Sequence, residues 1–529
     1  TDYFIEKVLP LPRELDSDRQ RSHLARLAAA HHKPASDDLA EKAISVADSL
    51  SAGTDRKQGE EAEGDYKTAR LLSVFEQISL DAPRSLEELQ KGQCHPLKCL
   101  SEDPFPTSLE KARKSTYPQL FEKLVRDLEQ LPLNMGVSHY LAALQSLLEV
   151  YTWCIPSSTY QSLADISLYD HAATTAAIAQ TLAAYHDSCG GLPGEGVESA
   201  EKFLLLGGDL SGIQKYIFGI DKSHGSGVAK LFRARSFYLQ MLTRAVITDL
   251  LQRLNLTPLA KIMDAGGRFI LLLPVTSQVK QLLIAFELEV QAFFFERFRG
   301  ELSLNLCWSS ELTEADFRLV CFQKKLDEFN DALEKRKLRK FDRLIEKGLN
   351  PVIDLDYSAY ENGDCPVCHV RPVDMEASSR HRKNYGVEIN ICRDCHDQIE
   401  MIGSRLHHCD YLILDRNASG GIKLFGGLYL HLEKMVNPDI HRQAIEIVSL
   451  RKRGRFAYQP IATHPPTIKD QDLSIWKNWG ELEERGASLW FKDEKVAVGE
   501  PKTFNLMARS AREMDASGNP IGRSFLGAF

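Results

Sequence analysis

The stretch FLLLGGDLSGIQKYIF, residues 203–218, joins four apolar residues to two glycines, an acid and a serine. A short apolar run bounded by turn residues is typical of a buried strand, and glycines let the backbone turn sharply or approach a ligand closely. The pattern predicts a strand over 203–209 and a ligand-holding turn at Asp209 and Ser211. Both residue types also favour the N-cap of a following helix, so the two interpretations stay open.

The segments that follow predict an α+β unit. Its expected elements alternate between apolar runs and helical periodicity. They are a helix at about 229–255, a hairpin KIMDAGGRFILLLP (261–274) with Gly266 and Gly267 at its turn, a helix at about 277–298 and a strand LSLNLCW (302–308). The order β-α-β-β-α-β is the ferredoxin-like arrangement, which polymerase and nucleotidyl-cyclase palm domains use. Fold alone does not assign a function.

Composition limits the class of protein. The chain has 529 residues, 43% of them hydrophobic and 26% charged, so we expect three or four soluble domains. A net charge of −8 argues against a uniformly basic nucleic-acid surface but leaves local basic patches open. We find neither an apolar run of membrane-spanning length nor a secretory signal in the sequence, and therefore expect no membrane partner and a cytoplasmic location.

The flanking segments predict further elements. Residues 1–190 have helical periodicity, interrupted at 51–70 by a polar stretch that we expect to be a surface loop. The Gly-, Pro- and Glu-rich segment 189–201 marks a domain boundary. A strongly charged helical segment spans 313–348, and its charges suggest a solvated face or a contact to another subunit. Strands are expected again over 410–432.

Four cysteines form the strongest local motif. Cys365 and Cys368, and Cys392 and Cys395, are two CxxC pairs separated by 23 residues. Two such pairs complete a tetrahedral site for zinc, and four thiolate ligands leave no open coordination position. The sequence predicts a structural Zn2+, since four exposed free thiols would be prone to oxidation.

Histidines and acids in the helical region suggest a second site. His31 and His32 stand near Asp48 in sequence, and His171 lies further along among Asp165 and Asp170. Such residues from different helices suit a divalent-metal phosphohydrolase. Surface or helix-capping roles are the alternative.

A basic cluster begins the helix expected at 229–255. Lys230, Arg233 and Arg235 are spaced to meet phosphates or a neighbouring subunit. A solvated helix face explains them equally well.

Several stretches together resemble the large subunit of type III-A CRISPR effector complexes, the Csm complexes. They occur in the family's order over almost the whole chain. They are AAHHKP, ADSLSAGTDR, DISLYDHAATTAAIA, GGDLSGIQKYIF, RARSFYLQMLTRAV, AGGRFILLLP, the paired cysteines and IGRSFLGAF. The resemblance implies an HD nuclease domain acting on single-stranded DNA, two palm domains that make cyclic oligoadenylates from ATP, and a zinc-bearing linker between the palms.

The resemblance implies a fold class and a set of domains. The class is α+β and multidomain. The expected domains are a helical HD-like domain at 1–190, a first palm at 200–312, a helical and zinc-binding linker at 313–500 with the cysteine module at 363–396, and the start of a second palm at 501–529. The His-Asp dipeptide is expected upstream of Thr1 and the catalytic GGDD hairpin beyond Phe529, because neither is found where the family carries it.

The resemblance also assigns site residues. His32, Asp48 and His171 correspond to HD metal or active-site positions, with Mg2+, Mn2+ or another divalent metal. In the first palm, the implied nucleotide-binding positions are Asp209, Ser211, Gly212, Gly266, Gly267 and Arg268. Arg268 stands where a catalytic hairpin carries an acid, so this palm is expected to hold ATP rather than to catalyse its transfer.

Two functions are therefore weighed. The first is an enzyme subunit that cleaves single-stranded DNA and synthesises cyclic oligoadenylates after target RNA is bound. The second is a non-catalytic scaffold that binds guide RNA and neighbouring subunits. The expected partners are the guide CRISPR RNA, target RNA, single-stranded DNA and other Csm subunits, including the one that caps the guide 5′ end and the small subunit. A stand-alone diguanylate-cyclase-like enzyme is disfavoured by the missing acidic hairpin.

Overall fold

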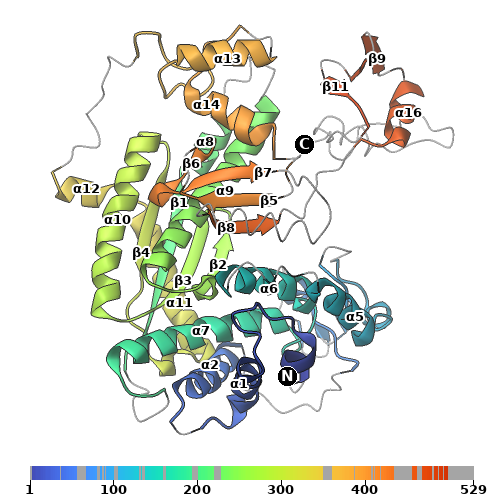
Figure 1. Ribbon diagram of the computed structural model, residues 1–529, viewed down its shortest axis with the longest axis vertical. Coiled ribbons are helices and arrows are strands. Elements are labelled where there is room, and N and C mark those ends of the chain that lie inside the picture. Colours follow the sequence, from blue (N-terminus) through green and yellow to red (C-terminus); the bar gives the residue numbers. More distant parts are fainter. Residues whose placement is uncertain are drawn as a thin grey trace.

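The protein is described by a computed structural model, shown in Figure 1. The described residues are 3–35, 37–55, 67–79, 84–85, 88–89, 91–100, 105–129, 131, 133, 137–158, 163–193, 200–219, 228–348, 360–385, 388–406, 409, 411–416, 419–433, 455–460, 468–478, 480, 482–485, 488–491 and 494–498. Within them, no helix is long and apolar enough to cross a membrane.

The N-terminal region is helical, as predicted. Its helices are α1 (Asp18–Ala29), α2 (Leu39–Asp55), α4 (Leu109–Ala112), α5 (Tyr117–Leu128), α6 (Val137–Thr152) and α7 (Leu168–Cys189), with short helical turns η1 (Phe4–Val8), η2 (Ala30–His32) and η3 (Val74–Gln77). The side chain of Ser167 caps α7 by accepting a hydrogen bond from the main-chain nitrogen of Asp170. Helix α7 ends at Gly190, whose positive φ of 78° suits a glycine.

The prediction of a surface loop over 51–70 is wrong for its first five residues. Residues 51–55 continue α2, because this end of the helix is held by packing. The hydroxyl of buried Ser51 donates a hydrogen bond to the main-chain oxygen of His171. A Cβ at Gly53 would lie 2.4 Å from the carbonyl oxygen of Phe317, so the backbone is closely packed there as well. Residues 56–66 lie outside the described part.

The central unit has the predicted order of elements. They are β1 (Phe203–Ser211), α8 (Ile213–Phe218), α9 (Val228–Arg253), η5 (Pro258–Ala260), β2 (Lys261–Ala265), β3 (Arg268–Pro274), α10 (Ser277–Phe298) and β4 (Ser303–Trp308). The four strands form one sheet in the order β2-β3-β1-β4, and every neighbouring pair is antiparallel. This strand order matches the β-α-β-β-α-β element order read from the sequence.

Both faces of this sheet are covered. Alternate residues of a strand point to opposite faces, so Leu204 and Leu206 belong to one core and Phe203 and Leu205 to another. The first core includes residues of α9 and α10, and the second includes residues of α2, α7 and α11 (Leu319–Arg336). The N-terminal helices are thus packed directly against the sheet, below it in Figure 1.

The charged segment 313–348 is not one continuous helix. Residues 314–316 form a short turn, η6 (Glu314–Asp316), capped by Thr313. Helix α11 ends at Arg336, and a second helix, α12 (Asp342–Glu346), follows Phe341. The backbone at Phe341 has a φ of 59°, a left-handed conformation that a continuing helix cannot contain.

The remaining elements form three groups. The cysteine region contains α13 (Met375–Tyr385), α14 (Arg393–Asp397) and η8 (Gln398–Gly403). A second sheet, in the order β6-β7-β5-β8, contains β5 (Tyr411–Asp415), β6 (Ile422–Lys423), β7 (Tyr429–Glu433) and β8 (Arg455–Pro460), with a short turn η9 (Phe425–Gly427). The third group is α16 (Asp470–Asn478) with β9 (Leu482–Arg485), β10 (Ser488–Phe491) and β11 (Glu494–Val496).

The second sheet shares a core with the central unit. Leu412 and Leu414 of β5 and Leu430 of β7 lie in the same buried cluster as Leu204 and Leu206 of β1. Strands were predicted over 410–432, and β5, β6 and β7 occupy that segment. The fourth strand, β8, was not predicted, and residues 501–529, expected to begin a second palm, lie outside the described part.

Candidate functional site

The four cysteines of the paired motif converge. Their sulfur atoms all lie within 4.8 Å of one another, and all four side chains are buried. The Sγ atoms of Cys368 and Cys392 are 3.8 Å apart. Four sulfurs at the Zn–S distance around a tetrahedral ion stand about 3.8 Å apart. The spacing therefore fits a tetrahedral metal site made of thiolates alone.

Local structure explains how each pair is placed. Cys392 is the N-cap of α14, where its sulfur accepts a hydrogen bond from the main-chain nitrogen of Cys395 at 3.4 Å. On the other side, the nitrogen of Cys365 donates to the oxygen of Arg371, which closes the first turn. The apolar cluster around the cysteines includes Leu231 of α9, so the module is packed on the central unit. It lies at the top of Figure 1, beside α8.

The two glycine turns predicted to hold a nucleotide lie side by side. The main-chain nitrogen of Leu210, just before the first turn, donates to the oxygen of Gly267 in the second. Gly212 has a φ of 95° and Gly267 a φ of 105°, conformations that favour glycine. A Cβ at Gly212 would lie 2.0 Å from the oxygen of Glu301, whereas one at Gly266 would meet nothing within 4 Å. Gly212 is thus required by packing, and Gly266 is at an open tip.

The hydroxyl of Ser211 is partly engaged. It accepts a hydrogen bond of 3.0 Å from the side-chain amide of Asn305 on the neighbouring strand β4. The N-cap of α8 is Gly212, with no side-chain cap, so neither Asp209 nor Ser211 serves in the capping role considered from the sequence. Ser211 is also the one residue of β1 that is not buried.

Asp209 and Arg268 face a helix. The two residues are cross-strand partners in the β1–β3 pair. Arg268 donates to the side-chain oxygen of Asn330 at 2.7 Å, and Asp209 is ion-paired with Lys337 at 3.0 Å. Asn330 belongs to α11 and Lys337 is its C-cap residue. These two candidate residues therefore have structural partners on α11.

The helical region brings two of its candidates together. His171 on α7 lies 3.2 Å from the carboxylate of Asp48 on α2, and its other ring nitrogen is 3.2 Å from the hydroxyl of Ser51. His32 lies in η2, where its ring contacts that of His31 in a tilted arrangement, with 3.8 Å between centroids. Among the described residues, the cysteines are the one group of three or more His, Cys, Asp or Glu whose ligand atoms lie within 4.8 Å.

The other acids of this region have structural partners. Asp170 accepts a hydrogen bond from the hydroxyl of Ser167 at 2.7 Å, and Asp165 accepts one from the side-chain amide of Gln77 at 3.0 Å. The Asp170 side chain therefore binds the residue that caps α7, Ser167. His32, Asp48 and His171 as an HD-type site remain a prediction.

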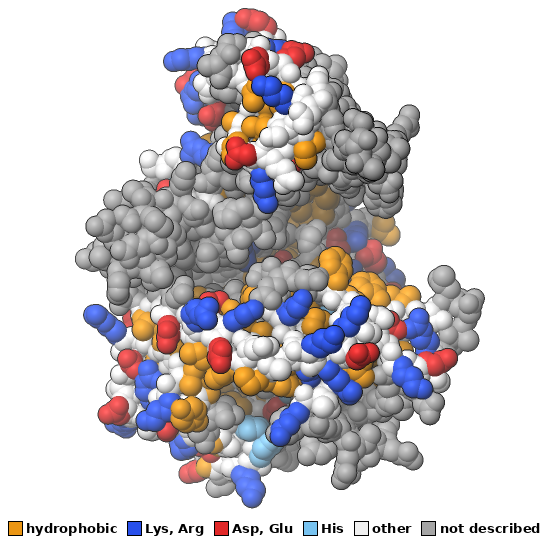
Figure 2. Space-filling model, turned by 90° about the vertical axis from the view of Figure 1, so that its right-hand side faces the viewer, with side chains coloured by type: hydrophobic (Ala, Val, Ile, Leu, Met, Phe, Trp, Pro, Cys, Tyr) orange, Lys and Arg blue, Asp and Glu red, His pale blue; other side chains and the backbone are white. Residues whose placement is uncertain are grey.

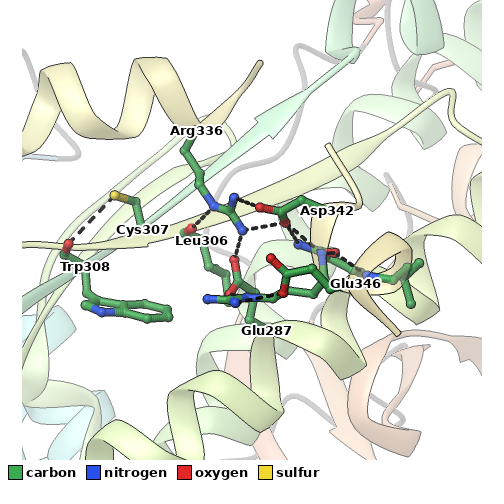
Figure 3. Close-up of polar contacts among 10 residues, drawn as sticks. Glu287, Leu306, Cys307, Trp308, Arg336, Asp342 and Glu346 are labelled. Carbon is green, nitrogen blue, oxygen red and sulfur yellow. Dashed lines mark hydrogen bonds and ion pairs between the residues drawn. The ribbon is translucent and has the colours of Figure 1, made fainter. Parts of the chain in front are cut away.

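The sequence did not reveal a buried ionic network beside the central sheet. The carboxylate of Glu287 on α10, 1% exposed, pairs with Arg336 and with Arg343. Figure 3 shows the guanidinium of Arg336 between Glu287 and Asp342, next to the oxygen of Leu306 on β4. Part of the charged segment 313–348 is thus turned inward, which corrects the expectation of a solvated face. The sequence could not show this burial, because a helix rich in charged residues has the same composition whether its side chains face solvent or a buried partner.

The interpretation of Arg235, near the start of α9, is also corrected. Arg235, expected on a solvated or phosphate-binding face, is 1% exposed.

Elsewhere, positive and negative side chains are mixed on the surface. On the face shown in Figure 2, Lys and Arg side chains stand among Asp and Glu side chains, so this face is not uniformly basic.

The central part of the chain matches a known family. Residues 202–351 match the model described as Csm1 subunit domain B. Curated relatives described as the CRISPR system single-strand-specific deoxyribonuclease Cas10/Csm1 of subtype III-A occur in Enterococcus italicus and Mycobacterium tuberculosis. The first is 28% identical over 363 residues, covering 61% of this chain and 46% of that protein. The second is 29% identical over 358 residues, covering 61% of this chain and 42% of that protein. The chain spans about half the length of these relatives or less.

Solved structures share the fold. A crystal structure of a Csm1–Csm4 cassette in complex with one ATP has a TM-score of 0.50 at 21% identity, over 75% of this chain and 45% of that one. The apo Csm1–Csm4 cassette has a TM-score of 0.50 at 19% identity, over 82% of this chain and 51% of that one. The mixed helix-and-sheet, multidomain fold class is confirmed. The resemblance to the large subunit of Csm complexes is confirmed as well.

Proposed function

We propose that this chain, a relative of Csm1, serves in the large subunit of a type III-A CRISPR interference complex. The observation that carries the proposal is the match of residues 202–351 to Csm1 subunit domain B. The intact subunit is proposed to cleave single-stranded DNA and to make cyclic oligoadenylates from ATP once target RNA is bound. Guide RNA, target RNA and the other Csm subunits are its proposed partners.

The central sheet is proposed to be a palm that holds ATP without catalysing its transfer. Nucleotidyl transfer needs carboxylates that hold two metal ions. The hairpin here carries Gly266, Gly267 and Arg268, and no GGDD occurs in the sequence. The turns at 211–212 and 266–267 are adjacent, and a Cβ at Gly266 would meet no atom within 4 Å. A phosphate or base can therefore approach the backbone closely at Gly266, which supports the holding role.

The nucleotide-binding set is refined by the contacts described above. We propose Ser211, Gly212, Gly266 and Gly267 as the residues that contact ATP. Asp209 and Arg268 are proposed to support these turns from behind, because their side chains are paired with α11. Divalent Mg2+ or Mn2+ is proposed to be needed for both reactions of the intact subunit.

The helical region is proposed to supply the nuclease. His171 and Asp48, 3.2 Å apart, support an HD-type arrangement in which an acid orients a histidine. His32 is proposed to complete the site with residues of the intact subunit. The four cysteines are proposed to bind a structural Zn2+, because their set is closed and buried.

The assembled complex provides the test. The large subunit, the other Csm subunits and a guide RNA are incubated with target RNA, ATP and Mg2+, and products are separated by chromatography. Oligoadenylate that depends on target RNA supports the synthase role, and its absence contradicts that role. We expect residues 1–529 alone to make none, since the acidic hairpin is missing.

A matched pair of variants tests the holding role. Ser211→Ala removes the hydroxyl without adding bulk, so we expect weaker ATP use with the fold retained. Ser310→Ala, at an exposed serine after β4, is the control. Equal ATP use by the two variants would contradict a nucleotide contact at Ser211.

A further inference from the structure

One guanidinium group joins the cysteine module to α8. Arg235 on α9 donates through Nη1 to the main-chain oxygen of Tyr216, and through Nη2 to the Sγ of Cys395 across 3.6 Å. Its Cζ also stands 4.8 Å from the centroid of the Tyr216 ring, within range of a cation–π contact. A charge that is 1% exposed needs partners to replace water, and these contacts supply them for Nη1 and Nη2.

The Tyr216 side chain is held from the module as well. Its hydroxyl accepts a hydrogen bond of 2.6 Å from the side-chain amide of Gln398. Gln398 begins η8, which directly follows α14 and the second cysteine pair. Tyr216 itself is fully buried in the middle of α8. The short helix α8 is therefore fixed through its carbonyl, its aromatic ring and its hydroxyl to groups at or next to the second cysteine pair.

A second connection runs to the other side of the turn. Arg371, just after the first cysteine pair, lies 2.8 Å from Asp394 and 3.3 Å from Glu301. Asp394 stands between the cysteines of the second pair. The main-chain oxygen of Glu301 is the atom that leaves no room for a Cβ at Gly212. The segment that packs on the Gly212 turn is thus ion-paired to the module.

These contacts indicate that metal binding by the four cysteines is coupled to the position of α8, which a structural metal alone does not imply. A metal that holds only its own loop would leave α8 in place when removed. Here the thiolate of Cys395 is also the acceptor for Arg235, and groups that orient a metal ligand typically change metal affinity when altered. The coupling runs in both directions, since linked equilibria are reciprocal.

We propose that the cysteine module braces α8 and the Ser211–Gly212 turn, with Arg235 as the positioning residue. Metal bound by the four cysteines keeps Cys395 in place for Arg235, and Arg235 keeps α8 in place. Loss of the metal releases both the module and the turn. The inference rests on the proposed zinc site, and it deepens the proposed function by making the nucleotide-holding turn depend on that site.

Hydrogen–deuterium exchange on the intact large subunit tests the brace directly. Zinc content is first measured on the purified protein, and exchange is followed with metal bound and after removal by a chelator. We expect amides in 212–219 to exchange at least about tenfold faster after removal, together with those of 363–396. Faster exchange confined to 363–396 overturns the brace and leaves the zinc site standing. A protein that carries no zinc overturns both.

Two variants on α9 distinguish a specific effect of Arg235 from a general loss of stability. Arg235→Lys keeps the charge and removes the forked donor that reaches Tyr216 and Cys395 together. We expect its zinc to pass to a competing chelator about 10- to 100-fold more readily, with 212–219 exchanging faster although zinc is bound. Arg253→Lys is the control, since Arg253 is on the same helix and pairs with Glu289 and Asp249 instead.

The absorption spectrum of bound Co2+ gives a readout that a general loss of stability does not change. With Co2+ in the four-cysteine site, the thiolate-to-metal absorption band reports the hydrogen bond to Cys395. We expect the band to shift in Arg235→Lys and to stay unchanged in Arg253→Lys. An unshifted band with unchanged zinc transfer in Arg235→Lys would overturn the positioning role, even if the chelation experiment releases α8.

Discussion

The ammonium group of Lys337 lies 3.0 Å from the carboxylate of Asp209, which fastens the C-terminal end of α11 to the end of β1. Asp209 is 9% exposed, so its charge depends on this partner and on Arg268 at 4.0 Å. The acid that the sequence places at a ligand-binding turn is therefore already paired inside the molecule. The pair joins a helix to the sheet.

Replacing Lys337 with Met should lower the free energy of unfolding by about 1–2 kcal/mol, because Asp209 is left nearly buried with a weaker partner. Lys335→Met, at an exposed neighbour, should change it by less than about 0.5 kcal/mol. Urea unfolding followed by circular dichroism measures both. Identical midpoints would show that α11 does not depend on the pair.

The difference in unfolding free energy between wild type and Lys337→Met should depend on pH in one direction. Burial works to lower the pKa of Lys337, but its hydrogen bonds to Glu334 and Asp209 raise it overall above the ordinary 10.5. A raised lysine pKa contributes stability that is complete below pH 10.5 and is lost as the pH rises through the folded value. The gap between wild type and Lys337→Met should be constant from pH 6 to 9 and shrink only in strong alkali.

Two glycines of the candidate nucleotide site should respond differently to alanine. Gly212→Ala places a Cβ 2.0 Å from the oxygen of Glu301, and should prevent α8 from docking. A Cβ in Gly266→Ala meets no atom within 4 Å. The positive φ of 62° alone disfavours alanine there, at a cost of about 1 kcal/mol. Hydrogen exchange of 212–219 should rise in the first variant and not in the second.

The buried carboxylate of Glu287 offers a second comparison. Glu287→Gln leaves Arg336 and Arg343 without their shared anion, so the free energy of unfolding should fall by about 3–5 kcal/mol. Glu289→Gln, two residues along α10 in an exposed pair with Arg253, should cost less than about 1 kcal/mol. Equal losses in the two variants would contradict the inward role of this network.

The same network should weaken in acid. Burial raises the pKa of Asp342, but its hydrogen bonds to Arg336 and Gln291 lower it overall below the ordinary 3.8. A lowered carboxyl pKa contributes stability that is complete above pH 3.8 and is lost as the pH falls through the folded value. Asp342→Asn should therefore flatten the pH dependence of unfolding below pH 4 and leave it unchanged above pH 5.

The proposed nuclease site predicts a loss of DNA cleavage. His171→Gln removes the basic nitrogen next to Asp48, and cleavage of single-stranded DNA by the assembled complex should fall about a hundredfold or more. His23→Gln, at an exposed histidine of α1, is the control. If the two variants cleave equally well, the HD assignment of His171 is wrong.

Metal analysis tests the cysteines without reference to activity. We expect one zinc per chain, and its loss in Cys365→Ser, because a four-thiolate site with one ligand removed binds poorly. Cys321→Ser, at an exposed cysteine of α11, should retain the full complement. Equal zinc in both variants would show that the metal, if present, is held elsewhere.

Local sequence signals predicted the central unit well. Helix 277–298 and the glycine hairpin after Lys261 were placed correctly, because Thr276 caps the one and two positive-φ glycines form the other. The paired cysteines also converged as expected. These features depend on residues close together in the chain.

Long-range partners were not predictable in the same way. Arg235 and Lys337 were read as surface charges, yet they meet Cys395, 160 residues away, and Asp209. A charged residue has the same appearance in sequence whether it faces water or a buried partner. Strand β8 was likewise missed, and it pairs with β5, which lies far from it in the chain. The break at Phe341 was missed as well.

The burial of β1 also limits how another molecule can reach this strand. Every residue of β1 is buried except the last, Ser211. Apolar cores cover both faces of the strand, so a molecule cannot lie flat on it. A molecule that binds β1 therefore meets the strand at its end, where Ser211 and the adjacent glycine turn lie.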